Sequence, residues 1–118
     1  LVAAEAFMLG RKAGVDGERL FGVLSNAGGR SHHFLKRFPF ALKRDFSPRF
    51  ALHLAEKDLR LALELGKRLQ YPMMMTSLAQ QLYAMAMGQG LQSEDVVAVI
   101  KLYEQWAGAK AAETTADP

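Results

Sequence analysis

Apolar residues recur every three or four positions along most of the chain, which is the spacing of one face of an α-helix. The longest such series runs from Phe50 to Leu69, and a second series follows it at Met74, Leu78, Leu82 and Met85. No run of five or more residues alternates between apolar and polar as a half-buried strand does. The pattern therefore predicts an all-α fold, with five or six helices around one long central helix.

Residues that start or stop helices mark the ends of the first three. Gly14 is suited to end a helix over residues 1–13, and Asp16 is placed to cap a short second helix. Ser31 begins a third helix. We expect this helix to break before Pro39, because proline disfavours the helical conformation in the residue before it.

Two prolines and a serine organise the second half of the chain. Pro48 fixes a loop before the long helix, Pro72 stands in the first turn of the next helix, and Ser93 caps the last one. Residues 1–107 are therefore expected to form one helical domain. The small and polar segment 108–118 is expected to be a disordered tail.

The two least charged helices point to something beyond this chain. Leu1 already belongs to the apolar pattern and no capping residue precedes it, so we expect the first helix to be the distal end of a longer one. Helices 1–13 and 72–87 carry too few charges for a fully solvated face. We therefore expect another subunit or domain to cover each of them.

One charged side chain interrupts the apolar face of the long helix. At about 100° per residue, Asp58 falls between Ala55 and Ala62 and in line with Leu65. Lys57 stands at the boundary between the apolar and polar faces. A buried carboxylate is costly unless hydrogen bonds or a cation compensate it, so the pattern predicts a partner for Asp58. The plainer interpretation is an exposed lysine beside an aspartate that caps or bridges to a neighbouring helix.

Composition narrows the class of protein without identifying it. The 118 residues, 50% of them hydrophobic, suffice for one domain with a real core. The absence of cysteine excludes disulfides, thiolate metal sites and a cysteine nucleophile. No apolar run reaches membrane-spanning length, and the lack of a signal peptide favours the cytoplasm. The net charge of +3 suits an anionic ligand but does not by itself indicate nucleic acid.

Several candidate sites have plain explanations. His32 and His33 are adjacent and point in different directions on a helix, so we assign no metal ligands. The NAGGR segment lacks the preceding strand and the following Lys-Ser or Lys-Thr of a phosphate loop. The six methionines are interpreted as core filler rather than as a recognition surface. No paired carboxylates or serine triad can be assembled, so the chain on its own lacks the parts of an enzyme.

A basic and aromatic segment permits one alternative function. Its five cations, interleaved with Phe34, Phe38 and Phe40, could bind single-stranded nucleic acid through phosphate contacts and stacking. These cations are Arg30, Lys36, Arg37, Lys43 and Arg44. The plainer interpretation is a solvated basic surface above buried aromatic side chains, and the helical spacing of the phenylalanines favours it.

Two short elements stand at a characteristic spacing. An F-x-P-x-F element occupies residues 46–50, and a Lys-Asp-Leu triplet follows at residues 57–59. Together with the segments EAFMLGRKAGVD, VLSNAGGRS and YPMMMTSLAQQLYAMAMGQG, they resemble the C-terminal helical domain of the β-hydroxyacid dehydrogenases. This is the family of 3-hydroxyisobutyrate dehydrogenase and tartronate-semialdehyde or glyoxylate reductase, related to 6-phosphogluconate dehydrogenase. The resemblance runs from Leu1 to about Trp106.

The resemblance implies a larger protein in which residues 1–107 are the C-terminal substrate and dimerisation domain. Family members begin with a Rossmann domain that binds NAD or NADP, and a catalytic lysine is expected about 12 residues, or three helical turns, before Leu1. The whole protein would transfer a hydride between the nicotinamide and a small hydroxy acid or semialdehyde. It would be a cytoplasmic homodimer or homotetramer without a membrane partner. This chain alone is expected to be inactive.

The family pattern also assigns roles to four residues. Lys57 would lie at the cleft between the two domains, where its cation could hold a cofactor phosphate or a substrate carboxylate. Phe50 matches the family aromatic near the nicotinamide, and Ser31 lies in the loop that faces the substrate. Asp58 would accept hydrogen bonds and so fix the helix edge that presents Lys57.

Overall fold

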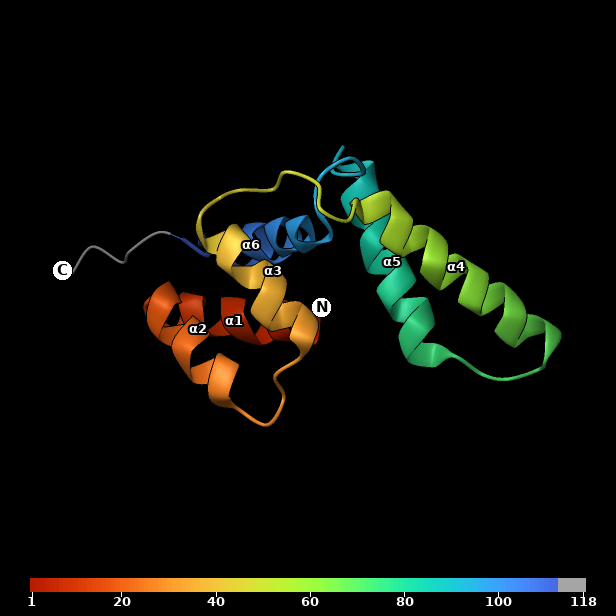
Figure 1. Ribbon diagram of the computed structural model, residues 1–118, viewed down its shortest axis with the longest axis horizontal. Helices are drawn as coiled ribbons and strands as arrows, with labels where there is room; N and C mark the ends of the chain where they lie inside the picture. The colour runs from red at the N-terminus through yellow and green to blue at the C-terminus, as the bar shows by residue number, and fades with distance from the viewer. Residues whose placement is uncertain (113–118) are drawn as a thin grey trace. The chain divides into compact units, whose positions relative to one another are not determined.

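The computed structural model describes residues 1–112 as six α-helices and one short 3-10 helix (Figure 1). In chain order they are α1 (Val2–Lys12), α2 (Gly17–Asn26), α3 (His32–Leu42), α4 (Leu52–Arg68), α5 (Met74–Gly88), η1 (Val96–Val99) and α6 (Ile100–Ala107). Within the described residues, the one β-type pairing is an isolated bridge between Ala51 and Asp95. The predicted all-α class is confirmed, and α4, with 17 residues, is the longest helix.

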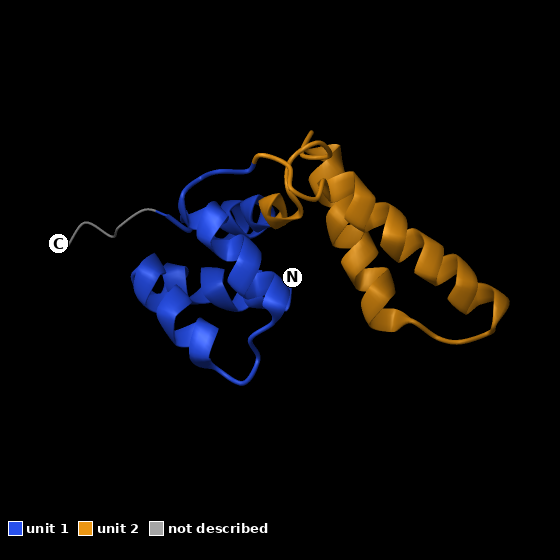
Figure 2. Cartoon of the chain, in the orientation of Figure 1, with its two compact units in different colours: residues 1–46, 100–118 blue, residues 47–99 orange. Residues whose placement is uncertain are grey.

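The chain divides into two compact units, which Figure 2 colours separately. Unit 1 contains residues 1–46 and 100–118, and unit 2 contains residues 47–99. Helices α1, α2, α3 and α6 therefore belong to unit 1, whereas α4, α5 and η1 belong to unit 2. No helix in the described part of either unit is long and apolar enough to cross a membrane.

Phenylalanine rings from α1, α2 and α3 form the centre of unit 1. The ring centroid of Phe38 lies 4.9 Å from that of Phe7 and 4.4 Å from that of Phe34, and Phe34 lies 5.5 Å from Phe21. All three pairs are tilted, an arrangement that aromatic rings prefer to a face-to-face stack. Phe34 and Phe38 are each 4% exposed, so the aromatic residues of the basic segment include two core residues.

Helix α3 continues through Pro39 to Leu42, so the predicted break before Pro39 is wrong. A proline inside a helix removes one backbone hydrogen bond and crowds the preceding turn. Here Phe38 and Ala41, on either side of the proline, are both buried. The Pro39 carbonyl also accepts from the Lys43 N–H at 3.3 Å. Burial of one continuous helix face therefore outweighs the local preference of proline.

After α6, residues 108–112 fold back onto unit 1. Arg11 is 4% exposed, and its guanidinium donates from Nε to the Lys110 carbonyl at 2.9 Å and from Nη1 to the Val15 carbonyl at 2.8 Å. The buried Glu104 carboxylate accepts from the Ala111 N–H at 2.8 Å, and Ala111 is itself fully buried. Two buried charged side chains thus hold the start of the predicted tail. Its remainder, 113–118, lies outside the described residues.

Helices α4 and α5 form a hairpin in unit 2, joined by residues 69–73 (Figure 1). At the base of the hairpin the Leu52 N–H donates to the Glu94 carbonyl at 2.8 Å, and the His53 N–H donates to the Gln92 carbonyl at 3.1 Å. The small apolar residues of η1, Val96 to Val99, are buried near these two hydrogen bonds. This pairing explains why α4 begins at Leu52 rather than at Phe50 as the sequence predicted.

Candidate functional site

The buried carboxylate of unit 2 belongs to Asp95, whose side chain organises the loop before α4. Asp95 is 1% exposed. Its Oδ2 accepts from the Arg49 N–H at 3.0 Å and the Phe50 N–H at 3.1 Å, and its Oδ1 accepts from the Val97 N–H at 3.1 Å. One carboxylate therefore ties the F-x-P-x-F element to the start of η1.

This arrangement corrects the prediction that Ser93 caps the last helix. The helical residues begin at Val96, and the Asp95 carboxylate accepts from the N–H of Val97, the second residue of η1. The usable signal was an acidic residue directly before the apolar run from Val96 to Ile100. The sequence did not reveal that the same carboxylate would reach back to residues 49 and 50, because that contact depends on the tertiary fold.

Phe50 is held through both of its backbone groups. Its N–H donates to Asp95 Oδ2, and its carbonyl accepts from the Val96 N–H at 2.8 Å. The residue is half-buried, so part of its surface stays accessible on unit 2. Phe50 is therefore a fixed element of the structure, and its contact with a nicotinamide stays a prediction.

Lys57 and Asp58 form an exposed ion pair on α4. The Lys57 Nζ lies 3.0 Å from Asp58 Oδ1, and the two side chains are 47% and 57% exposed. Exposed pairs of this kind contribute only about 0–1 kcal/mol to stability, because water screens them and the side chains lose freedom. The Lys57 ammonium is consequently held weakly and is available to another anion.

The prediction that Asp58 is buried is wrong for this chain. Helix α5 covers only one side of the apolar face of α4. On that side, Gln80 Nε2 donates to Glu56 Oε1 at 2.8 Å. The side of α4 that carries Asp58 is open, and Leu54, Leu61 and Leu65 on it are 37%, 48% and 48% exposed. The role of Asp58 as a support for Lys57 therefore stays a prediction.

Ser31 lies in unit 1, whereas Phe50, Lys57 and Asp58 lie in unit 2. Its hydroxyl caps α3 by accepting from the Phe34 N–H at 3.0 Å. Capping is a sufficient structural reason for a serine at this position. A contact between Ser31 and a substrate stays a prediction.

The basic segment does not present the aromatic surface that single-stranded nucleic acid needs. Phe34 and Phe38 are buried, and Arg44 Nη1 pairs with the buried Glu104 Oε1 at 2.5 Å. The Arg44 guanidinium also lies over the Phe46 ring, 4.9 Å from its centroid. Across residues 1–112, no group of three or more His, Asp or Glu side chains is arranged to hold a metal ion.

Comparison with known proteins agrees with the family resemblance. A protein-family model described as NAD-binding of NADP-dependent 3-hydroxyisobutyrate dehydrogenase matches residues 1–103. The 2-(hydroxymethyl)glutarate dehydrogenase of Eubacterium barkeri is 41% identical over 106 residues, which are 89% of this chain and 35% of that protein. The L-threonate dehydrogenase of Cupriavidus necator is 37% identical over 101 residues, which are 86% of this chain and 34% of that protein.

A solved structure is similar to this chain in fold as well as in sequence. The crystal structure of 3-hydroxyisobutyrate dehydrogenase from Salmonella typhimurium matches with a TM-score of 0.82 and 34% identity, over 86% of this chain and 35% of that one. The chain thus spans about a third of the length of the relatives that it matches.

Proposed function

Because this chain belongs to the family of NADP-dependent 3-hydroxyisobutyrate dehydrogenases, we propose that the whole protein is an oxidoreductase that uses NAD or NADP. The nicotinamide supplies hydride chemistry when it is bound. The substrate would be a small β-hydroxy acid or semialdehyde, in keeping with the names of the two dehydrogenases above. The single observation that carries this proposal is the family match over residues 1–103.

Within that protein, the present chain would supply one cationic contact to the bound molecules. Lys57 is the candidate, because its ammonium is exposed and tied only to an exposed aspartate. A lysine ammonium is a compact charge that suits a phosphate or a carboxylate. Phe50 would lie against the nicotinamide, and Ser31 would face the substrate. Asp58 would keep the edge of α4 in place.

In this proposal, parts of the protein outside this chain supply the rest of the reaction. The general acid would be a lysine upstream of Leu1, and a Rossmann domain before it would bind most of the cofactor. A homodimer or homotetramer and a cytoplasmic location are parts of the same proposal. The alternative of a nucleic-acid-binding module finds no support, since the relatives described above are dehydrogenases.

Replacement of Lys57 by alanine in the whole protein tests this function. Loss of one hydrogen bond from a charged group costs about 1.5–3 kcal/mol, so kcat/KM should fall roughly 10- to 150-fold while the thermal unfolding temperature stays close to that of the parent. Arg68→Ala removes another exposed cation from α4 and serves as the control. Equal activity of Lys57→Ala and the parent would exclude the cationic contact, and absence of any NAD- or NADP-dependent activity in the parent would exclude the oxidoreductase.

A further inference from the structure

Several of the described helices end in the same hydrogen-bonded turn, in which one residue takes the left-handed backbone conformation. These residues are Gly14, Arg44, Gln70, Gly90 and Gly108. Glycine adopts this conformation readily, whereas a residue with a Cβ is strained in it. Arg44, with a φ of +57°, and Gln70, with a φ of +53°, therefore occupy their positions against the preference of the backbone. Such strain persists where the surrounding structure compensates it, and it is frequent at functional sites.

The Arg44 guanidinium makes two contacts within unit 1. Its Nη1 pairs at 2.5 Å with Oε1 of Glu104, whose side chain is 1% exposed. Its Cζ lies over the Phe46 ring, 4.9 Å from the centroid, and the Lys101 Nζ lies 4.2 Å from the same centroid. Cations within about 6 Å of a ring centroid are attracted by the electrons of the ring. The ring of Phe46 is therefore held by a cation that a buried carboxylate keeps in place.

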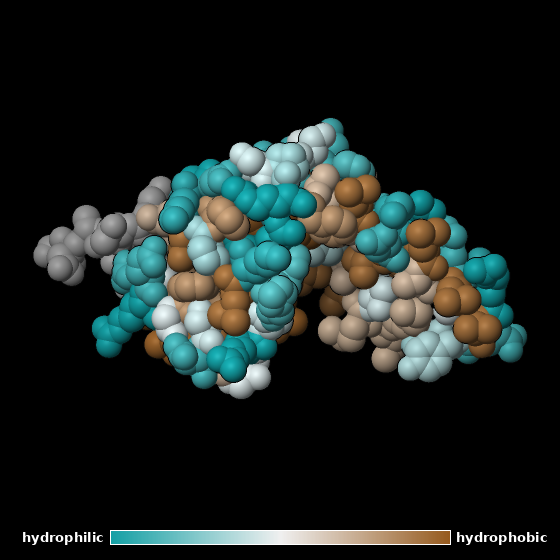
Figure 3. All heavy atoms as spheres, viewed as in Figure 1, coloured by the Kyte–Doolittle hydropathy of each residue, from teal (hydrophilic) through white to brown (hydrophobic). Residues whose placement is uncertain are grey.

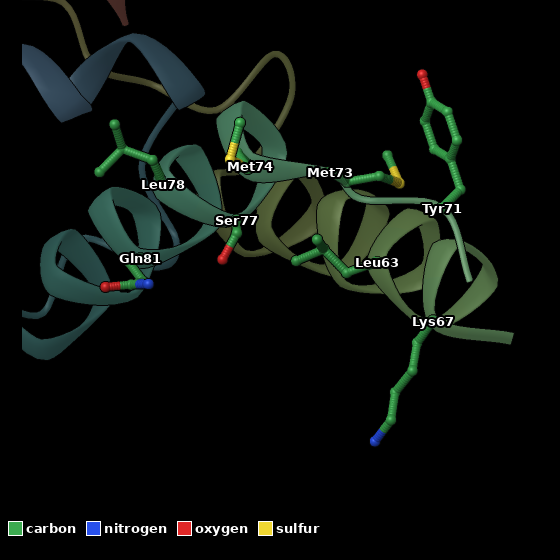
Figure 4. Close-up of a pocket in the computed structure, with 8 residues that line it drawn as sticks. All are labelled: Leu63, Lys67, Tyr71, Met73, Met74, Ser77, Leu78 and Gln81. Carbon is green, nitrogen blue, oxygen red and sulfur yellow. The ribbon is translucent and has the colours of Figure 1, made fainter. Parts of the chain in front are cut away.

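Gln70 takes the same strained turn at the tip of the α4–α5 hairpin, where its side chain is exposed. Tyr71, the next residue, is 68% exposed and lines an open groove of about 500 Å³ (Figure 4). Figure 3 shows hydrophobic side chains on the surface of unit 2. Met74 in the groove and Met85 further along α5 are 80% and 49% exposed, so the interpretation of the methionines as core filler is wrong for both. Gln70 thus shares the backbone turn of Arg44 but not a buried partner.

We propose that Arg44 is a positioning residue for the cofactor, because by holding Phe46 it orders the F-x-P-x-F element before a dinucleotide binds. This inference rests on the proposed function, in which Phe50 lies against the nicotinamide. Phe46 is the first residue of that element and Phe50 is the last. An arginine suits this role, since its planar guanidinium can pair with a carboxylate and lie over an aromatic ring at the same time.

Contacts of this kind hold both ends of the element. Asp95 Oδ2 accepts from the Phe50 N–H at 3.1 Å, and the two cations lie against the Phe46 ring. Between these ends, the ring of Pro48 restricts its own backbone φ. A segment that is already ordered loses little conformational freedom when a ligand binds to it. Release of Phe46 would restore freedom to the residues before Phe50, and each backbone residue that must be ordered again weakens binding about 10-fold.

Titration of the whole protein with NADH and NADPH, followed by the fluorescence of the nicotinamide, tests this role. In Arg44→Gly the Kd of the dinucleotide should rise about 10-fold, while circular dichroism shows unchanged helix content. The Kd of ADP-ribose or its 2′-phosphate should not change, because these nucleotides carry no nicotinamide. Gln70→Gly removes a side chain from the same type of turn and should bind every nucleotide as the parent does.

A second variant shows whether Arg44 acts through Phe46. Phe46→Leu leaves the Arg44–Glu104 pair in place and should raise the Kd of the dinucleotide by the same factor. The double variant should then bind no more weakly than either single variant, because both changes release the same ring. Losses that multiply to about 100-fold in the double variant would show that the two residues act independently and would overturn the inference.

The nucleotide series separates this inference from the proposed function. A parent that binds NADH or NADPH, together with an Arg44→Gly variant that binds it equally well, would overturn the positioning role alone. An equal loss for ADP-ribose would also overturn that role, since it would show general damage to the protein. A parent that binds neither dinucleotide would exclude the oxidoreductase and this inference with it.

Discussion

Asp95→Ala should strongly destabilise unit 2. The substitution removes the acceptor of three backbone N–H groups, from Arg49, Phe50 and Val97, at 3.0 to 3.1 Å. The residue is 1% exposed, so little water is present to replace the carboxylate. The loss would loosen the F-x-P-x-F element and the start of α4 together.

The magnitude follows from the number of groups that lose their partner. A buried donor left without an acceptor costs about 1–3 kcal/mol, and the three costs do not add fully because the loop relaxes and admits water. We expect a loss of about 3–5 kcal/mol in the free energy of unfolding, a large part of the ~5–15 kcal/mol of a typical domain. Asp95→Asn keeps the shape and one oxygen, so its cost should be smaller.

Urea denaturation followed by far-UV circular dichroism measures this cost. Asp58→Ala is the matched control, because the same change at a 57% exposed carboxylate should cost less than about 1 kcal/mol. Hydrogen exchange at the amides of Arg49, Phe50 and Val97 should accelerate in Asp95→Ala more than elsewhere. Equal costs for the two alanine variants would show that the Asp95 hydrogen bonds give no net stabilisation and would refute the reasoning.

Two further substitutions test unit 1. A Cβ at Gly17 would collide with the Ala111 carbonyl, so Gly17→Ala should release residues 108–112. Hydrogen exchange at the Ala111 amide should then accelerate. Unchanged exchange at this amide would contradict the packing of Gly17 against Ala111. Burial, and then the nearby Glu5 carboxylate, raises the pKa of Tyr103 above its ordinary value. The protonated Tyr103 side chain therefore stabilises the folded state, and this contribution is complete below about pH 10. It is lost as the pH rises through the raised pKa, because the unfolded chain releases the proton first. Tyr103→Phe should flatten this decline in urea unfolding between about pH 9 and 11, and an equal slope in both proteins would contradict the assignment.

Features that depend on neighbouring residues could be predicted from the sequence. Helical periodicity predicted the all-α class, and helix ends followed local chemistry. Asp16 accepts from the Arg19 N–H at 3.0 Å, and Gly14 takes a φ of +87° just after α1. The F-x-P-x-F element and the Lys-Asp-Leu triplet, together with three further segments, indicated the family. The helix ends are readable because each arises from backbone geometry within about one helical turn.

Which helix faces are covered depends on packing between distant segments, and the predictions that were wrong concern these faces. Pro39 stays helical because Phe38 and Ala41 are buried together on α3. The aspartate that needs buried partners is Asp95. Its carboxylate accepts from the backbone N–H groups of Arg49 and Phe50, which lie 46 and 45 positions earlier in the chain. Asp58 has the sequence pattern of a buried residue, yet α5 leaves its side of α4 open. Periodicity shows that a helix has an apolar face, but only packing between distant segments determines what lies against it.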